Sequence, residues 1–300
     1  RIMCGIVGLL VKKPALRAEL GRLMVPMMVE MASRGPESAG LAVFTGALSD
    51  DHRKLSLYAP DWHYDWAAFE GAFITHFGTD ASIRPKGNHA VLTSDVAVER
   101  VKPWLRAQFP QLHVLAAGRT LDIYKDTGHP ARVAERYDFG QLTGTHLVGH
   151  TRMATESAVT PDRAHPFTAG EDFCLVHNGT ISNPYMIRRK LEHRGIRFET
   201  DNDTEAACRY LEWRMREGDD LETALAKGFE ELDGFYTFLI GTENKMALVR
   251  DAFACKPAIV AETDDYVAVA SEFRALAHLP GVNEARLFEP RPEEIYSWTV

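Results

Sequence analysis

The chain has 300 residues, of which 45% are hydrophobic and 25% charged, and its formal net charge is −8. This composition is typical of a globular protein with a sizeable core, and an acidic chain without a run of Lys and Arg argues against a nucleic-acid partner. The four cysteines, Cys4, Cys174, Cys208 and Cys255, lack metal-ligand spacing, so we expect reduced thiols and neither disulfides nor a metal site.

The first predicted element is a strand at Gly5–Leu10. The apolar run around it, Ile6–Val11, is far too short to span a bilayer, and nothing before Cys4 could serve as a signal sequence. We therefore expect a cytoplasmic protein without membrane association.

Short β-branched or apolar runs predict strands along the whole chain, and helical periodicity predicts helices between groups of them. The predicted strands are Gly5–Leu10, Gly40–Phe44, Ala90–Thr93, His146–Arg152, Phe173–His177, Tyr236–Ile240, Lys245–Arg250, Ala258–Ala261 and Tyr266–Ala270. The predicted helices are Leu16–Ala32, Trp62–Ile74, Asp95–Gln108, Pro184–Arg194, Thr204–Arg216 and Leu221–Leu232. This order favours an α+β architecture with antiparallel sheets over a doubly wound parallel sheet.

The chain has no internal repeat, no low-complexity tract and no Pro/Gly/Ser-rich linker. We therefore expect a single domain over residues 1–300. The region at about 50–143 carries aromatic and charged residues but no chemical constellation, so we interpret it as an insertion that elaborates the core fold.

The first chemical motif is Met3-Cys4-Gly5-Ile6-Val7-Gly8. If the preceding residues are removed, Cys4 carries both a thiol and a free α-amine, whose unperturbed pKa of roughly 7.7–8.0 suits a general base. The alternative is a cysteine that acts as a small buried hydrophobe. The motif alone favours neither interpretation.

The second motif is Gly149–Thr155, followed by His165-Pro166-Phe167. Arg152 lies at a predicted strand end before a loop of small and hydroxylated residues, and its guanidinium fork suits the α-carboxylate of an amino acid. A surface arginine at a turn is the better interpretation if this motif is taken alone.

The third motif, Leu175–Gly179, is an apolar strand that ends in Asn-Gly. Attack of a thiolate on an amide creates an oxyanion, and the Asn178 side chain with the Gly179 backbone N–H could donate to it. Asn-Gly is also the commonest two-residue hairpin turn, which is favoured for this motif alone.

The fourth motif, Glu199–Glu205, precedes a predicted helix. Helix capping and favourable charge at a helix N-terminus explain some of these acids. A carboxylate here could also bind the ammonium of an amino acid, and Asp203 is the candidate, with capping as the equal alternative.

In order and character, the four motifs resemble those of the class II glutamine amidotransferases from Cys4 to at least Glu272. The interval from Asn178 to Asp203 is similar to that in glucosamine-6-phosphate synthase-type domains. Further segments that resemble family motifs are Arg34–Gly40, Arg250-Asp251, Lys256-Pro257 and Ala270–Glu272.

The resemblance implies a four-layer αββα fold of the N-terminal-nucleophile type. It implies Cys4 as the nucleophile that forms a thioester, Asn178 and Gly179 as oxyanion donors, and Arg152 and Asp203 as the clamp on the glutamine backbone. Thr155 and His165 are expected to support the glutamine loop. The half-reaction implies no metal and no organic cofactor in this chain.

Three departures from the family pattern concern Met153, Ala254-Cys255 and the start of the chain. Met153 occupies a position where many relatives carry Trp, and Ala254-Cys255 replaces a Gly-containing turn. Residues Arg1 and Ile2 precede Met3, so a chain that keeps them has no free amine on Cys4.

The leading hypothesis is a glutaminase that supplies ammonia to a separate synthase subunit, since the chain ends at Val300 without an acceptor domain. The chain resembles subunits of the glutamate-synthase and N-methylglutamate-synthase type, which implies a hetero-oligomer and leaves a flavin or iron–sulfur cluster to the partner. One alternative is a silent scaffold subunit with Cys4 blocked by Arg1-Ile2-Met3. Another is an unrelated amide hydrolase, against which the pair Arg152 and Asp203 argues.

Overall fold

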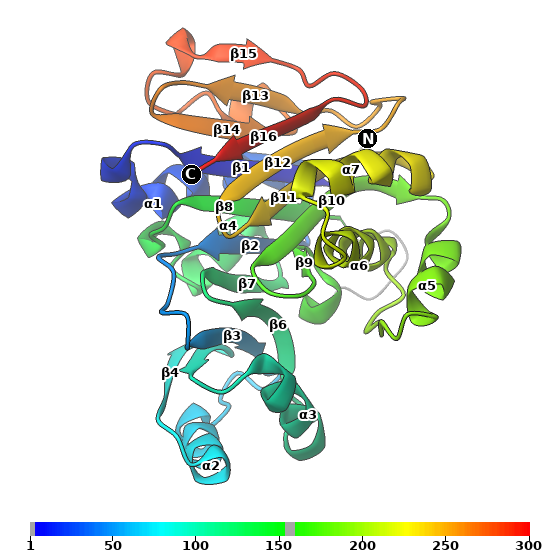
Figure 1. Ribbon diagram of the computed structural model, residues 1–300. Coiled ribbons are helices and arrows are strands. Elements are labelled where there is room, and N and C mark those ends of the chain that lie inside the picture. The colour runs from blue at the N-terminus through cyan, green and yellow to red at the C-terminus, as the bar shows by residue number, and fades with distance from the viewer. Residues whose placement is uncertain (1–3, 154–159) are drawn as a thin grey trace.

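Two antiparallel sheets lie at the centre of the molecule (Figure 1). The computed structural model describes residues 4–153 and 160–300. The larger sheet has the strand order β15 (Arg286–Phe288), β13 (Ile259–Glu262), β14 (Tyr266–Ala270), β1 (Gly5–Val11), β8 (His146–Arg152), β2 (Ser38–Phe44) and β7 (Leu121–Thr127). The smaller has the order β16 (Ile295–Thr299), β12 (Lys245–Arg250), β11 (Gly234–Thr242), β10 (Phe173–Ile181) and β9 (Phe167–Thr168).

The side chains of β1 show why the two sheets stack. Successive residues of a strand point to opposite faces of its sheet. Val7 and Leu9 belong to the core that packs against α1 (Leu20–Glu30). Ile6 and Leu10 belong to the core between the two sheets. Because both faces of β1 are buried, its sequence is apolar at almost every position.

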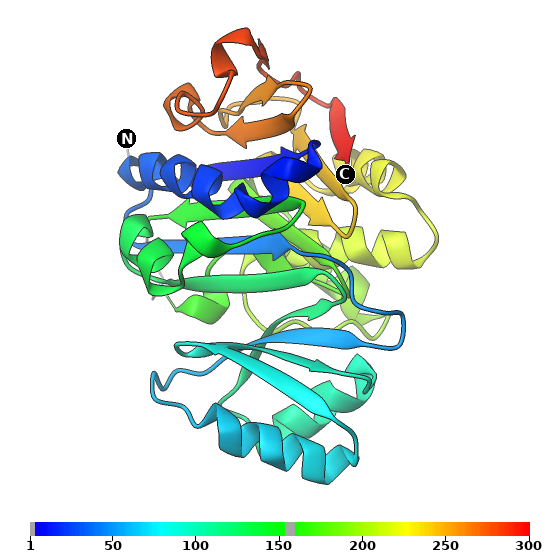
Figure 2. The ribbon, with the colours of Figure 1, turned by 90° about the vertical axis from the view of Figure 1, so that its left-hand side faces the viewer.

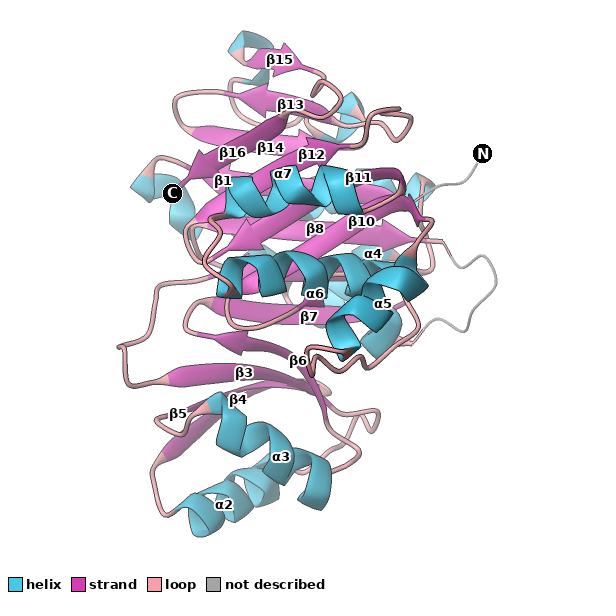
Figure 3. Cartoon of the chain, turned by 45° about the vertical axis from the view of Figure 1, so that its right-hand side comes forward, coloured by secondary structure: helices cyan, strands magenta, loops and turns pink. Residues whose placement is uncertain are grey.

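Helices cover the outer face of each central sheet (Figures 2 and 3). The larger sheet is covered by α1 and α4 (Pro130–Arg136), and the smaller by α6 (Asp203–Arg216) and α7 (Leu221–Glu231), with α5 (Pro184–Glu192) beside α6. This order of helix, sheet, sheet and helix confirms the predicted α+β architecture. Among residues 4–153 and 160–300, no helix has both the length and the apolar character that a membrane crossing requires.

The remaining elements form a separate layer at one edge of the larger sheet (Figure 1). This layer contains a four-stranded sheet of β4 (Ala81–Lys86), β5 (His89–Ser94), β3 (Arg53–Tyr58) and β6 (His113–Gly118), covered by α2 (Trp66–Phe77) and α3 (Val98–Gln108). Its core of apolar and aromatic side chains includes Phe69, Phe73 and Trp104. We call residues 53–118 the insertion.

The insertion is shorter than the region of about 50–143 that the sequence predicts. Its last part folds differently, because β7 pairs with β2 in the larger sheet and α4 packs on α1. Two buried contacts join the insertion to β7: Lys54 Nζ lies 2.8 Å from Asp122 Oδ1, and Ile123 N donates to Ser56 Oγ at 3.0 Å. Both contacts lie at the boundary between the insertion and the core.

Candidate active site

Cys4 lies immediately before β1 and is half-buried. Its main-chain oxygen accepts two hydrogen bonds, from Asn178 Nδ2 at 3.0 Å and from Arg34 Nε at 3.0 Å. The next residue must be small, because a Cβ on Gly5 would lie 2.7 Å from Thr151 Oγ1 and 2.8 Å from Met31 Cβ. The backbone of Cys4 is therefore held between the two central sheets.

Two other segments that resemble family motifs meet at Cys4. Arg34 Nη1 forms an ion pair with Glu272 Oε1 at 2.7 Å, which orients the guanidinium that contacts the Cys4 carbonyl. Ser271 Oγ accepts from Ile6 N at 2.9 Å and from Asn178 Nδ2 at 3.3 Å. The sequence does not predict these contacts, although the segments that make them resemble family motifs.

Asn178 is a buried residue in β10, where it pairs with Thr237 of β11. Its Oδ1 lies 3.1 Å from His150 Nε2. Burial lowers the pKa of His150 to about 3, so the ring is neutral near pH 7. Since Oδ1 can only accept, Nε2 carries the ring proton, and the Asn178 amide has its NH2 group on the side of Cys4.

Gly179 continues the strand, so the Asn-Gly pair is not a hairpin turn. It has φ of +134° and pairs with Tyr236. A Cβ at this position would lie 2.0 Å from the main-chain oxygen of Phe235. Only glycine fits here, because a side chain would meet both the unfavourable backbone conformation and the neighbouring strand.

Three buried histidines surround Asn178. The rings of His150 and His165 are stacked, with centroids 4.1 Å apart, and His177 Nδ1 lies 3.0 Å from Thr204 Oγ1. Burial lowers the pKa of His177 to about 4, although the negative charge of Asp203 opposes this shift. Burial also lowers the pKa of His165 well below its ordinary value. The three rings are therefore neutral near pH 7.

Asp203 is the first residue of α6, and its Oδ2 accepts from Ile181 N at 2.9 Å. The capping position belongs to its neighbour Asn202, whose Oδ1 accepts from Thr204 N at 2.8 Å. The carboxylate of Asp203 thus contacts the end of β10, the strand that carries Asn178 and Gly179. Capping, which the sequence offered as an alternative role for Asp203, is carried out by Asn202.

Arg152 is the last residue of β8, two positions after His150 and thus on the same face of the strand. Its Nη1 donates to the Arg163 main-chain oxygen at 3.3 Å. Gly35 lies against this strand end, since a Cβ there would come within 2.6 Å of Arg152 N. Thr155, the other residue predicted for this loop, lies outside the described residues.

Direct contacts therefore join Cys4 to Asn178, and Asn178 to the His150–His165 pair. Asp203 and Arg152 lie at the ends of the strands that carry these residues. Within the two described ranges, no three His, Cys, Asp or Glu residues are arranged to hold a metal ion. The sequence analysis assigns no role to His150 and His177. A polar residue inside an otherwise apolar strand is a signal that could have identified both as site residues.

Known proteins are similar to this chain in sequence. A family model for a glutamine amidotransferase domain matches residues 150–278. The glutamine amidotransferase-like protein GlxB of Rhizobium meliloti (strain 1021) is 45% identical over 297 residues, which cover 99% of this chain and 98% of that protein. The glutamine–fructose-6-phosphate aminotransferase of Methanothermobacter thermautotrophicus is 32% identical over 51% of this chain, equal to 26% of its own length.

A solved structure shows the same fold. Glutamine phosphoribosylpyrophosphate amidotransferase from B. subtilis superposes with a TM-score of 0.61 at 20% identity, covering 99% of this chain and 49% of that one. The likeness places the chain on the N-terminal-nucleophile amidotransferase fold that the sequence predicts. The chain belongs to the class II glutamine amidotransferase family.

Proposed function

We propose that this protein hydrolyses the side-chain amide of glutamine to glutamate and ammonia, with Cys4 as the nucleophile. The observation that carries the proposal is the 3.0 Å contact between Asn178 Nδ2 and the Cys4 main-chain oxygen, across 174 positions of sequence. It brings an amide donor, oriented by His150, beside the backbone of the half-buried Cys4. A nucleophile with an adjacent fixed donor suits amide hydrolysis.

The proposed reaction begins with transfer of the thiol proton to the α-amine of Cys4. The thiolate attacks the amide carbon, and Asn178 and Gly179 stabilise the oxyanion of the tetrahedral intermediate. Collapse breaks the C–N bond, the amine returns a proton to the leaving group as ammonia, and a thioester remains. Water then releases glutamate and restores the thiol. Residues 1–3 must be removed first, because an acylated amine is not basic.

Asn178 donates both of its amide protons in this structure, to the Cys4 oxygen at 3.0 Å and to Ser271 Oγ at 3.3 Å. We propose that, during the reaction, the oxyanion takes the place of Ser271 Oγ as an acceptor for Asn178 Nδ2. Asn178→Ala should then lower kcat by about 10²–10³. The measurement is glutamate release by the processed protein.

The matched control for this experiment is Asn183→Ala. Asn183 Nδ2 also donates to a main-chain oxygen, that of Glu231 at 2.9 Å, but in the region between α5 and α7. This variant should keep the parent kcat. Equal rates for the two alanine variants would exclude an oxyanion role for Asn178.

We further propose that Arg152 binds the α-carboxylate of glutamine and Asp203 its ammonium group. Arg152→Ala and Asp203→Asn should each weaken glutamine binding by about 1.5–3 kcal/mol, seen as an increase in KM, because each removes a charge-assisted hydrogen bond. Asparagine keeps an acceptor for Ile181 N while it removes the charge. Asp201→Asn, at an exposed position of the same loop, is the control. An unchanged KM in both site variants would rule out the clamp.

We propose that the ammonia passes to a synthase subunit of the glutamate-synthase or N-methylglutamate-synthase type in a hetero-oligomer. In this assembly, any flavin or iron–sulfur cluster belongs to the partner and none to this chain. Chemistry supports the proposal, since ammonia released near neutral pH is protonated and lost. Hydrolysis should be slow in the isolated chain and faster in a complex purified from the source cell. A monomer that is fully active and recovers no synthase would contradict the partner while leaving the glutaminase intact.

A further inference from the structure

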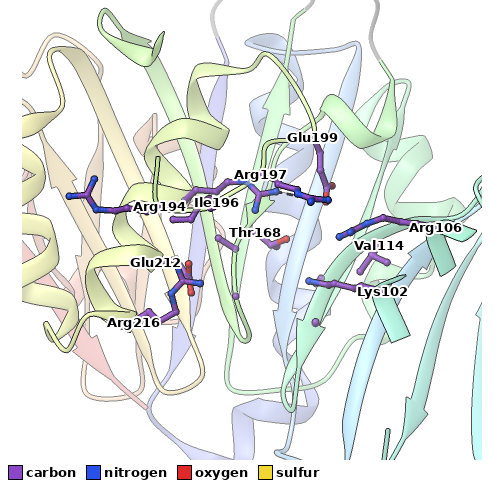
Figure 4. Close-up of a pocket in the computed structure, with 16 residues that line it drawn as sticks. Lys102, Arg106, Val114, Thr168, Arg194, Ile196, Arg197, Glu199, Glu212 and Arg216 are labelled. Carbon is purple, nitrogen blue, oxygen red and sulfur yellow. Dashed lines mark ion pairs between the residues drawn. The ribbon is translucent and has the colours of Figure 1, made fainter. Parts of the chain in front are cut away.

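A cleft of about 360 Å³ opens between the insertion and the core (Figure 4). One wall comes from α3 and β6, which contribute Lys102, Arg106 and Val114. The opposite wall comes from α6 and the segment at 194–199, which contribute Arg197, Arg209 and Arg216. The residues of the candidate active site do not line this cleft.

The lining of the cleft is strongly basic, whereas the whole chain has a net charge of −8. Two acidic residues, Glu199 and Glu212, line it together with six basic ones. The basic residues are Lys102, Arg106, Arg194, Arg197, Arg209 and Arg216. A concave surface lined by one sign of charge concentrates ions of the opposite sign. The cleft is therefore suited to an anion.

Most of these cations are available to a ligand. Arg209 is bound to Glu205, with Nε 2.7 Å from Oε1. In the described part of the chain, by contrast, the side chains of Lys102, Arg106, Arg197 and Arg216 make no hydrogen bond or ion pair with one another or with a carboxylate. These four side chains can donate to a bound anion without breaking an existing contact.

Burial disfavours the charged forms of two residues that line the cleft. It lowers the pKa of the half-buried Lys102, and the charge of Glu199 only partly opposes this shift. It also raises the pKa of Glu212, which disfavours the negative form of that acid. A bound anion would offset the cost of burying the Lys102 ammonium, because an opposite charge favours the charged form.

We propose that this cleft binds a small organic polyanion, a phosphorylated or polycarboxylated metabolite. Its volume lies within the range typical of small-molecule sites, and its walls come from two packed units instead of one flat surface. None of the described residues that line it is aromatic, so the cleft offers no ring on which a nucleotide base could stack. Guanidinium groups bind both phosphate and carboxylate by paired hydrogen bonds. The proposal does not depend on glutamine hydrolysis.

The test is calorimetric titration of the full chain with inorganic pyrophosphate and, separately, with citrate. We expect saturable binding of one molecule of at least one of them. Preference for pyrophosphate would identify a phosphate ligand, and preference for citrate a carboxylate ligand. Absence of saturable binding for both would overturn the proposal.

The site is located by charge reversal at two exposed residues. The double variant Arg197→Glu/Arg216→Glu should lower the affinity more than about tenfold, because it removes two charged donors. The single variant Arg106→Glu tests the other wall and should weaken binding in the same direction. Arg17→Glu/Arg132→Glu, two exposed residues on the α1 side, changes the net charge equally and should bind like the parent. Equal affinity in the two double variants would show that the anion does not bind in the cleft.

Discussion

Cys4→Ala is expected to abolish glutamine hydrolysis by protein from which residues 1–3 have been removed, with a loss of at least about a thousandfold. The reason is that the thioester cannot form without the thiol. The two buried cysteines cannot replace it, because burial raises the pKa of Cys174 to about 12 and that of Cys208 well above its ordinary value. The measurement is glutamate release, after intact-mass analysis has shown that Cys4 is the first residue.

Cys255→Ala is the matched control, since Cys255 is an exposed free thiol and should be dispensable. Processed Cys4→Ala protein that hydrolyses glutamine at the parent rate would end the proposal. Intact mass of the natively expressed protein also separates the two functions that the sequence left open. A chain that keeps Arg1–Met3 and is inactive would be the silent scaffold, whereas a processed and active chain would be the glutaminase.

Acidification from pH 7.5 to pH 5.5 is expected to lower the free energy of unfolding by about 7 kcal/mol. The cause is a set of five histidines whose pKa values are lowered by burial in the folded state. They are His89, His146 and His150, each with a pKa of about 3, His177 with a pKa of about 4, and His165, which is shifted in the same direction.

The sign follows from where the protons bind. In the unfolded chain these rings titrate near pH 6.5, so at pH 5.5 they are mostly protonated, while the folded chain keeps them neutral. Above the unfolded pKa of about 6.5 the rings are neutral in both states and protonation costs no stability. As the pH falls from there towards the folded pKa values of about 3–4, the unfolded chain binds protons that the folded chain does not, and stability is lost. Each ring accounts for about 1.4 kcal/mol at pH 5.5.

Urea unfolding at the two pH values measures this loss. His146→Gln should reduce it by about one fifth, because it removes one of the five rings. His193→Gln, at an exposed position, is the control and should leave it unchanged. Equal free energies of unfolding at pH 7.5 and pH 5.5 would contradict the neutral state of the five buried histidines.

The central sheets could be predicted from the sequence because their strands are buried on both faces. The predicted bounds of β8, β12 and β14 match the structure residue for residue, and β12 and β14 each contain a nearly continuous apolar run. The strands that the predictions missed include β3 and β7, which contain Lys54 and Asp122. These charges are buried because they pair with each other, and a local pattern does not reveal a partner that is distant in sequence.

The same limit applies to the site. The resemblance to class II amidotransferases identified Cys4 and Asn178, and the structure brings them together. It did not predict how Asn178 is oriented, because its contacts to His150 and Ser271 span 28 and 93 positions. These contacts depend on the stacking of two sheets, which only the folded chain defines.

The boundary between the insertion and the core restricts how this polypeptide can be shortened. Lys54 neutralises the buried Asp122, and the buried carboxylate of Asp172 accepts from the backbone nitrogens of Arg119, Thr120 and Leu121. Both cations near the Asp122 carboxylate, Lys54 and Arg84, belong to the insertion, so excision of residues 53–118 removes the cover of this carboxylate together with its partners. A chain that keeps the layer and loses only Lys54 would instead bury an unpaired charge, which is strongly destabilising. Deletion variants for crystallography or expression should therefore remove the layer as a whole and keep Asp122.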